Sequence, residues 1–244
     1  MPENMNSQWS ELERAFSSER DQFAHKVDLT QYIDDPFLFT KRQRVTDFLT
    51  RIELFKKIVS VEGAVVECGV HKGGSLMLYY HLASILEPYG LKRQVLGFDS
   101  FEGFPGTSSS DPQILDKDIF ADTDYQVLAD AIRIHDKNRA LPHISRCEVI
   151  KGDATQTIPK YKSENPHLVV AMLYLDFDLY EPTKTAIDEL LPLVPKGGIV
   201  AFDELNTKKW PGETIALKES LNLAQVKLQK FYFDPWPCYF VVGE

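Results

Sequence analysis

Short apolar runs alternate with amphipathic segments along most of this chain. Residues 168–175 carry no charge and are rich in branched side chains, as expected for a strand buried on both faces. Residues 182–194 repeat apolar positions at helical spacing, and Ile199–Phe202 is a second uncharged run. This order predicts a strand–helix–strand unit with a right-handed crossover, which places the two strands in parallel.

The same pattern extends over the rest of the chain. Alternating or wholly apolar runs predict further strands at Ala64–Cys68, 94–98, Cys147–Lys151, 226–233 and 238–242. Helical spacing predicts helices at 9–23, 40–60, 125–138 and 211–223. The last two strands are joined by a short turn, so they cannot both run parallel to the others. We therefore expect an α/β fold with a mostly parallel sheet.

Polarity divides the chain into two parts. The 244 residues suffice for one large α/β domain. Residues 1–39 are polar with little periodicity, whereas 40–60 form an amphipathic helix ahead of the first strand. We expect an N-terminal helical extension over residues 1–60, serving as a cap or an oligomer contact, and a main domain over 61–244.

Charge and composition exclude several classes of protein. A net charge of −9 argues against a nucleic-acid partner, because phosphate binding requires a basic face. Apolar runs are too short to cross a membrane, and residues 1–20 lack the apolar centre of a signal peptide. The scattered cysteines, Cys68, Cys147 and Cys238, suggest a reducing compartment. We expect a soluble cytoplasmic protein with no membrane partner.

Acidic pairs follow both strands of the central unit. Asp176 and Asp178 come after the first strand, and Asp203 and Glu204 after the second. Carboxyl ends of neighbouring parallel strands meet at one edge of a sheet, where open α/β folds bind ligands. Crowded carboxylates repel one another, and Mg²⁺ prefers oxygen ligands. The pattern indicates a magnesium site, although solvated strand ends that cap the following helices are the simpler alternative.

A glycine-rich turn follows the first strand. Its glycines permit close approach to the backbone, and the next helix begins with free N–H groups, which suits an adenosine cofactor. The pattern is not GxGxxG, which disfavours a dinucleotide. The candidate cofactor-binding residues of this turn are Glu67, Gly69, His71, Gly73 and Ser75. His71 is also a candidate base or acceptor contact.

Two further strand ends carry acids. Asp99 ends the second strand and is suitably placed for a ribose diol, with Ser100 and Phe101 beside it. Asp153 and Ala154 follow the third strand, where an acid can meet an exocyclic amine. Residues 106–124 are too long for a simple connection and are interpreted as a lid over the substrate.

Five motifs in this order resemble one family. They are VECGVHKGGS, GFDSFEGFPG, VIKGDATQTIP, LYLDFDLYEPTKTAIDEL and PKGGIVAFDE. Together they resemble the macrocin O-methyltransferases, which are class I S-adenosylmethionine-dependent enzymes that methylate sugar hydroxyls in natural-product pathways. The resemblance covers roughly residues 61–220. It implies a Rossmann-like seven-stranded sheet with one antiparallel strand and helices on both faces, with S-adenosylmethionine and Mg²⁺ as cofactors.

Residue by residue, the resemblance also implies roles. Asp176, Asp203 and Glu204 match the metal ligands, and Asp178 matches the general base. The family usually ends that strand Asp-Asp, so Glu204 has to ligate through a longer arm. Asp176 and Asp178 can exchange roles. In the cofactor site, the resemblance matches Glu67, Gly69, Gly73, Asp99, Asp153 and Ala154, and we add Asp176 as a cofactor contact.

The expected reaction is the transfer of a methyl group to a sugar hydroxyl. Because such a hydroxyl is a weak acid, a base alone is poorly matched to it, and a cation that lowers its pKa is useful. The acceptor is either a nucleotide-linked deoxysugar or a sugar already attached to a natural product, with small diols less favoured. A metal-dependent glycosyltransferase or a non-catalytic ligand-binding module are the alternatives; an aspartyl phosphatase and an NAD-dependent oxidoreductase fit the motifs less well.

Overall fold

The computed structural model describes residues 7–104, 106–112 and 120–244, and these fall into two compact units, Met1–Asp47 and Phe48–Glu244. In chain order the elements of the first unit are α1 (Ser7–Ala24), α2 (Leu29–Asp34) and the short 3-10 helix η1 (Pro36–Leu38). Helix α3 (Arg42–Ile58) begins in the first unit and continues into the second. The helices predicted at 9–23 and 40–60 are therefore present, with slightly different ends.

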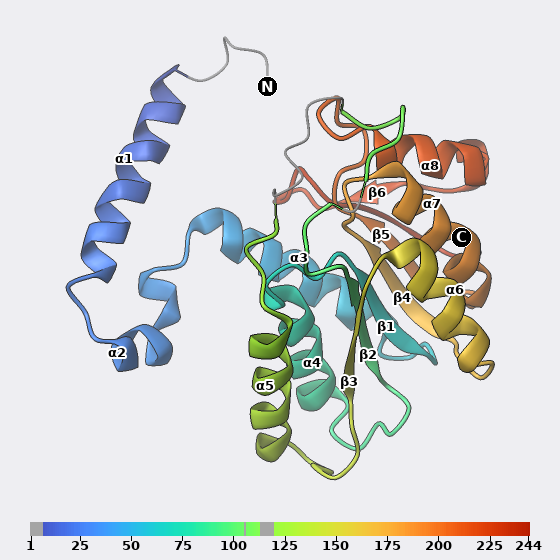
Figure 1. Ribbon diagram of the computed structural model, residues 1–244, viewed down its shortest axis with the longest axis horizontal. Coiled ribbons are helices and arrows are strands. Elements are labelled where there is room, and N and C mark those ends of the chain that lie inside the picture. The colour runs from blue at the N-terminus through green and yellow to red at the C-terminus, as the bar shows by residue number, and fades with distance from the viewer. Residues whose placement is uncertain (1–6, 105, 113–119) are drawn as a thin grey trace. The chain divides into compact units, whose positions relative to one another are not determined.

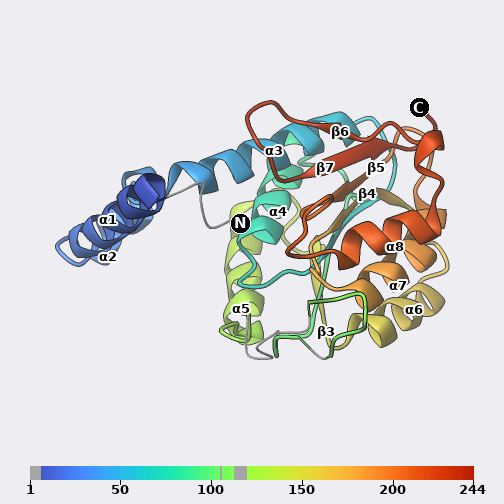
Figure 2. The ribbon, with the colours of Figure 1, turned by 90° about the horizontal axis from the view of Figure 1, so that it is seen from above.

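The second unit is built on one seven-stranded sheet (Figures 1 and 2). Its strands lie in the order β3-β2-β1-β4-β5-β7-β6. Their bounds are β1 Ala64–Cys68, β2 Val95–Asp99, β3 Cys147–Lys151, β4 Val170–Leu175, β5 Ile199–Phe202, β6 Gln229–Lys230 and β7 Cys238–Val241. Strands β1 to β5 pair in parallel, and β7 pairs antiparallel with both β5 and β6. The predicted sheet with one antiparallel strand is confirmed.

Helices cover both faces of this sheet (Figures 1 and 2). One face packs against the C-terminal half of α3, against α4 and against α5, while the other packs against α6, α7 and α8. The bounds are α4 Gly74–Leu86, α5 Tyr125–His135, α6 Ala154–Glu164, α7 Tyr180–Leu190 and α8 Gly212–Ser220, with 3-10 turns η2 Asp136–Asn138, η3 Leu191–Leu193 and η4 Leu223–Gln225. The predicted helices at 125–138, 182–194 and 211–223 correspond to α5 with η2, α7 with η3, and α8.

Alternation along the strands sends side chains into two separate cores. In β1, Val65 joins the cluster under α3 and α4, whereas Val66 and Cys68 join the cluster under α6 and α7. Every residue of β4 is fully buried, as its uncharged sequence predicts. Cys68 and Cys147 are buried and all three cysteines are free, which agrees with their interpretation as reduced thiols.

Strand β6 is much shorter than the sequence pattern predicted. Strand β6 contains only Gln229 and Lys230, although the apolar pattern predicted a strand over 226–233. It is an edge strand that pairs with β7 alone. Beyond it, the Phe231 ring stacks on Phe233 and on Tyr239 at centroid distances of 5.3 Å. The aromatic residues of this segment therefore pack through their rings and do not extend the hydrogen-bonded strand.

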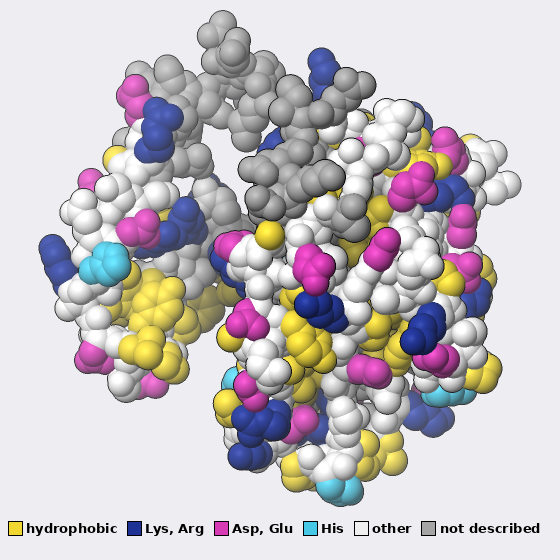
Figure 3. All heavy atoms as spheres, in the orientation of Figure 1, with side chains coloured by type: hydrophobic (Ala, Val, Ile, Leu, Met, Phe, Trp, Pro, Cys, Tyr) yellow, Lys and Arg dark blue, Asp and Glu magenta, His cyan; other side chains and the backbone are white. Residues whose placement is uncertain are grey.

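The first unit exposes apolar side chains. Phe39 is buried in it and stacks on Phe23 and Tyr32 at centroid distances of 5.4 and 4.7 Å. Outside this cluster, large apolar side chains stay exposed around α2 and η1, where Figure 3 shows hydrophobic atoms gathered on the surface; they are Leu29, Ile33, Phe37 and Leu38. No helix in the described residues is both long and apolar enough to cross a membrane.

Candidate functional site

One cavity of about 370 Å³ lies at the carboxyl ends of the four central strands β2, β1, β4 and β5. Parallel strands bring the residues that follow them to this edge, which is the reason sequence reasoning placed the site here. The predicted site residues that line the cavity are Gly69, His71, Asp99, Ser100, Ala154, Asp176, Asp178, Asp203 and Glu204. Both the predicted cofactor turn and the predicted acidic pairs therefore meet in one place.

The turn after β1 passes very close to the strand end of β4. A Cβ atom on Gly69 would lie 1.9 Å from the carbonyl oxygen of Asp176, and the φ angle of Gly69 is +92°. The backbone N–H of Asp176 donates to the carbonyl of Cys68 at 2.8 Å. Only glycine permits this approach. The glycine turn and the end of β4 are therefore in direct backbone contact at the edge of the cavity.

Asp99 joins the turns after β1 and β2 through hydrogen bonds. Its Oδ2 accepts the backbone N–H groups of Val70 and His71, each at 2.8 Å, and its Oδ1 accepts that of Phe101 at 2.7 Å. Hydrogen bonds to a carboxylate are roughly twice as strong as neutral ones. Asp99 therefore fixes the loops after β1 and β2 and also faces the cavity, where its remaining lone pairs can meet a diol.

Three predicted residues of the glycine turn support the site from outside the cavity lining. Glu67 is fully buried in β1, and Ser75 is 7% exposed in the first turn of α4. Gly73 precedes α4 with a φ of +83°, and a Cβ there would meet the side chain of Leu128 at 2.4 Å. These positions shape the turn and the start of the helix.

Two other predicted contacts also lie outside the lining. Phe101 is 6% exposed, and its ring packs edge-on against Tyr125 at 5.5 Å, so it belongs to the core. Asp153 caps α6, because its Oδ1 accepts the backbone N–H and the hydroxyl of Thr155 at 2.9 and 2.8 Å. Ala154, the next residue, does line the cavity.

An aromatic wall completes the cavity, and sequence reasoning missed most of it. The Phe104 ring lies 5.7 Å from Phe120 and 6.0 Å from Trp210, both edge-on. Lys209 also lines the cavity, with its ammonium group 5.1 Å from the Trp210 ring centre. Trp210 is 6% exposed although it stands in an irregular segment. The KKWPG sequence after the second acidic pair was the available signal.

The loop predicted as a lid is partly described. Residues 113–119 of the predicted lid lie outside the described residues. In the part before them, Asp111 Oδ2 accepts the N–H and hydroxyl of Ser108 at 2.7 and 2.8 Å. Its Oδ1 accepts the N–H of Tyr180, the first residue of α7, at 2.7 Å.

The second described part of this loop begins at Phe120. In it, Asp122 contacts His71 at 3.1 Å and also pairs with Lys72. The described lid segments are thus attached to both α7 and the cofactor turn.

The four predicted acids also line the cavity, in a part that we call the acidic wall, and burial raises the pKa of three of them, Asp176, Asp178 and Glu204. Asp178 is 8% exposed with a left-handed φ of 62°. Burial first, then Glu204 and Asp203, raise its pKa to about 7. Burial also raises the pKa of Asp176, as does Asp203, while Arg51 opposes this shift. The pKa of Glu204 is raised by burial and by Asp203. This wall therefore holds more negative charge than its surroundings compensate.

Sequence reasoning did not single out a fifth acid, Glu213. It is fully buried at the start of α8, and its Oε2 accepts the backbone N–H of Glu204 at 3.2 Å. Burial first, then Asp178 and Asp203, raise its pKa well above the usual value. Its Oε1 and the Oε2 of Glu204 are buried without a hydrogen-bond partner in the described part of the chain. The Gly212-Glu213 pair at a helix start was the only signal.

The donor set suits a hard divalent cation. Asp176, Asp178, Asp203 and Glu204 all reach the cavity, and a buried carboxylate oxygen without a partner is an open acceptor. Asp203 is held in place because its Oδ1 accepts the hydroxyl of Tyr174 at 2.6 Å, which leaves Oδ2 for another partner. Within residues 7–104, 106–112 and 120–244, no three Asp, Glu, His or Cys side chains already stand in metal-ligand arrangement. The chemistry of these oxygen donors therefore fits Mg²⁺.

Comparison with known proteins points to one family of enzymes. The model of the macrocin O-methyltransferase family (TylF) matches residues 15–240. A curated relative from Streptomyces olivaceus, 8-demethyl-8-(2,3-dimethoxy-alpha-L-rhamnosyl)-tetracenomycin-C 4'-O-methyltransferase, is 30% identical over 148 residues. That match covers 59% of this chain and 53% of the relative, so it spans about half of the relative's length.

Solved structures agree over nearly the whole chain. The calicheamicin methyltransferase CalS11 superposes with a TM-score of 0.89 at 32% identity, covering 95% of this chain and 93% of that one. A second structure of CalS11, described as a TDP-rhamnose 3'-O-methyltransferase, gives a TM-score of 0.82 at 31% identity, with 95% of each chain covered. The O-methyltransferase NovP, at 20% identity over 81% of this chain and 79% of its own, shares the fold with a TM-score of 0.64. The resemblance seen in the five motifs is confirmed, and this chain belongs to the macrocin O-methyltransferase (TylF) family.

Proposed function

We propose that this protein transfers a methyl group from S-adenosylmethionine to a hydroxyl of a sugar in natural-product biosynthesis of the antibiotic type. The observation that carries the proposal is the cavity in which the glycine turn and Asp99 face a wall of carboxylates. Membership in the TylF family and the similarity to two sugar O-methyltransferases support it. An open α/β edge with a tight glycine turn suits the adenosine portion of the donor.

In this proposal the donor lies against the turns that Asp99 fastens. The backbone of Gly69 leaves room for it, and the Asp99 carboxylate accepts from the ribose diol. Ala154 and the ring of Phe104 line the cavity and offer apolar contact to the adenine. Because these groups are already held in place, donor binding requires little rearrangement of the protein.

The acidic wall positions and activates the acceptor. Asp176, Asp203 and Glu204 are the proposed holders of Mg²⁺, which supplies Lewis-acid polarisation and orientation of a hydroxyl when bound. Asp178 is the proposed general base, since its burial and raised pKa keep it near the range useful for proton transfer at neutral pH. Its strained left-handed backbone agrees with a functional position. The assignment of Asp176 and Asp178 to these two roles remains interchangeable.

Two sugar acceptors are consistent with the relatives. One relative is described as acting on a rhamnosyl-tetracenomycin and another as a TDP-rhamnose methyltransferase. We therefore propose a deoxysugar acceptor, either nucleotide-linked or attached to a natural product. The aromatic wall of Phe104, Phe120 and Trp210 offers flat apolar surface for a sugar face or for the group that carries it.

Calorimetric titration tests the donor half, and product analysis tests the acceptor half. S-adenosylmethionine is titrated into the wild type and into Asp99→Ala, and micromolar-range binding should be lost in the variant. TDP-rhamnose and a rhamnosylated polyketide are then incubated with the donor, with EDTA or with added Mg²⁺. Methylated sugar that disappears with EDTA is the expected result. Absence of donor binding to the wild type would overturn the proposal, and sugar release from the nucleotide would favour the glycosyltransferase alternative.

A further inference from the structure

A buried guanidinium, that of Arg51, lies beside the acidic wall without being part of the cavity lining. Arg51 of α3 is 3% exposed and belongs to the face of the sheet that α3 and α4 cover. Around it stand the fully buried Glu67, Tyr79 and Tyr174. Placing a charge in such an apolar core destabilises the fold unless its surroundings compensate it. The contacts of the Arg51 side chain therefore show which groups compensate its charge.

The contacts of Arg51 lead to both acidic strand ends. Its Nη2 lies 3.6 Å from Asp176 Oδ2, directly after β4. Its guanidinium carbon lies 4.5 Å from the centre of the Tyr174 ring, a cation–π contact. Tyr174 in turn donates its hydroxyl to Asp203 at 2.6 Å. One cation thus touches one acid directly and the other through a single aromatic side chain.

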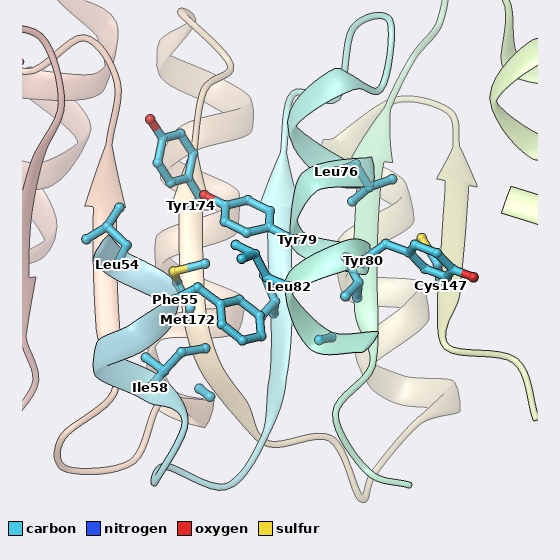
Figure 4. Packing of buried hydrophobic residues seen from close by; sticks show 14 of the residues in the cluster. Leu54, Phe55, Ile58, Leu76, Tyr79, Tyr80, Leu82, Cys147, Met172 and Tyr174 are labelled. Carbon is cyan, nitrogen blue, oxygen red and sulfur yellow. The ribbon is translucent and has the colours of Figure 1, made fainter. Parts of the chain in front are cut away.

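The strand–helix packing fixes this arrangement. Figure 4 shows Tyr174 of β4 beside Tyr79 of α4, above the apolar side chains with which α3 covers the sheet. Leu54, Phe55 and Ile58 anchor α3 there and are fully buried. Because these side chains hold the helix, the guanidinium has little freedom to move. A fixed cation restricts the rotamers of the carboxylate it faces.

Other buried arginines of the same chain show what a purely structural arginine does. Arg93 and Arg146 are each 5% exposed. Arg93 donates to the backbone carbonyls of Ile58, Val61 and Gly63 and also pairs with the Glu87 carboxylate at 2.8 Å, and Arg146 donates to the carbonyls of Ala83, Glu87 and Pro88. Both hold helix ends and loops, and backbone carbonyl oxygens are most of their described partners. The described contacts of Arg51 are instead the carboxylates of Glu67 and Asp176 and the ring of Tyr174.

We infer that Arg51 is a positioning residue of the methyl-transfer reaction, which orients Asp176 directly and Asp203 through Tyr174. This inference rests on the proposed function, because it concerns the two acids assigned to the acceptor wall. Arg51 is not among the residues that line the cavity, so we assign it no direct contact with a bound substrate. Its contribution is to hold two carboxylates from neighbouring strands in one geometry, and misplacement by about 1 Å in such a site can cost about 100-fold in rate.

The test compares matched arginine variants. Arg51→Met removes the guanidinium and keeps an apolar side chain of similar length, and Arg146→Met does the same at a site remote from the cavity. We expect kcat of Arg51→Met to fall at least about tenfold, with the acceptor KM and the donor Kd within about threefold of the wild type. Arg146→Met should lower the melting temperature to a similar extent and leave kcat within about twofold. Arg51→Lys should recover only part of the rate, because an ammonium cannot both stack on Tyr174 and reach Asp176.

A double-mutant cycle tests the path through Tyr174. Tyr174→Phe keeps the ring under the guanidinium and removes the hydroxyl that Asp203 accepts. If Arg51 acts through this side chain, the losses in kcat from Arg51→Met and Tyr174→Phe should be non-additive in the double variant. Additive losses would overturn the indirect link to Asp203.

The outcomes separate the two proposals. A wild-type protein that binds the donor and methylates a sugar, with Arg51→Met and Arg146→Met equal in kcat, would overturn the inference about Arg51 alone. A wild-type protein that methylates no sugar would overturn the proposed function instead. Loss of donor affinity in Arg51→Met equal to its loss of kcat would show a general disturbance of the cavity and would also overturn the positioning role.

Discussion

The two walls of the cavity satisfy their carboxylates in opposite ways. On the donor side, both oxygens of Asp99 accept backbone N–H groups, and three hydrogen bonds hold the adjoining turns. On the acidic side, Glu204 and Glu213 each keep a buried oxygen without a hydrogen-bond partner in the described part of the protein. Burial raises the pKa of Asp178 to about 7 on the same side. One wall is complete without a ligand, whereas the other is not.

This difference shows where the protein holds strain. A fully hydrogen-bonded carboxylate stabilises the loops it joins and costs the fold nothing. Buried acids that repel one another destabilise the fold, and they are retained where function requires their charge. In the proposed function, the wall that holds Asp99 is a prepared binding surface for the donor, and the acidic wall is the part that a cation or a proton donor would complete. Substitutions on the two walls should therefore have different effects on catalysis, donor affinity and stability.

The largest effect is expected at Asp203. Asp203→Asn removes one negative charge while its amide oxygen can still accept from Tyr174. We expect kcat to fall at least about 100-fold, because charge on the acidic wall is needed only in the reaction. The donor Kd, measured by calorimetry, should stay within about threefold. Asp188→Asn, an exposed acid of α7 paired with Lys184, serves as the control. Equal losses in kcat and donor affinity would contradict the separation of the two walls.

Asp99 should show the reverse pattern. Asp99→Ala removes the three hydrogen bonds that hold the donor turns as well as the acceptor for a ribose diol. We expect the donor Kd to rise about 10- to 100-fold. Asp28→Ala, which removes the N-cap of α2, is the matched loss of a backbone-capping acid outside the cavity. Unchanged donor affinity in Asp99→Ala would count against this wall as the donor site.

Substitution of Asp178 should show how much the acidic wall lowers the stability of the fold. Its folded-state pKa is raised from 3.8 to about 7, so the stability it contributes is present below about pH 4 and is lost as the pH rises through about 7. Asp178→Asn removes that penalty. With EDTA present at pH 8, we expect its melting temperature to exceed that of the wild type by about 2–6 °C, and the gap to close near pH 4. A wild type that melts higher at pH 8 would refute this prediction, which calorimetric scans can decide.

The smallest effect is expected at the loop that Asp111 holds. Asp111→Ala removes the hydrogen bond by which the loop around residue 111 is attached to the start of α7. We expect the acceptor KM to rise about three- to tenfold with an unchanged donor Kd, because ordering that loop then costs binding energy. Ser108→Ala removes one of the two Ser108 bonds to Asp111 and should give a weaker effect of the same kind. Steady-state kinetics with varied acceptor concentration measures the acceptor KM of both variants. A change in donor Kd with an unchanged acceptor KM would contradict a role of this loop in acceptor binding.

Local patterning was sufficient for most of the sheet. The runs predicted as strands at Ala64–Cys68, Cys147–Lys151 and Ile199–Phe202 became strands with the predicted ends. Ile199–Phe202 is uncharged and buried throughout, as expected for a strand buried on both faces, whereas Cys147–Lys151 is a partly exposed edge strand that carries charged residues. Helix α6 was not predicted, because Pro159 lies inside it and its exposed face is polar. Strand β6 was predicted too long, because apolar residues at a sheet edge can pack their rings without extending the ladder.

The sequence by itself determined which acids meet. Asp99 ends a parallel strand and Asp176 and Asp203 each follow one, and chain connectivity alone brings such positions to one edge of the sheet. The other side chains that surround these acids and the cavity were decided only by the tertiary structure. Arg51, Tyr174 and Trp210 come from segments far apart in the chain, and each is an ordinary core or loop residue in its local sequence. Periodicity reports which face of an element is buried; which side chains then share that buried space depends on how whole elements pack against one another.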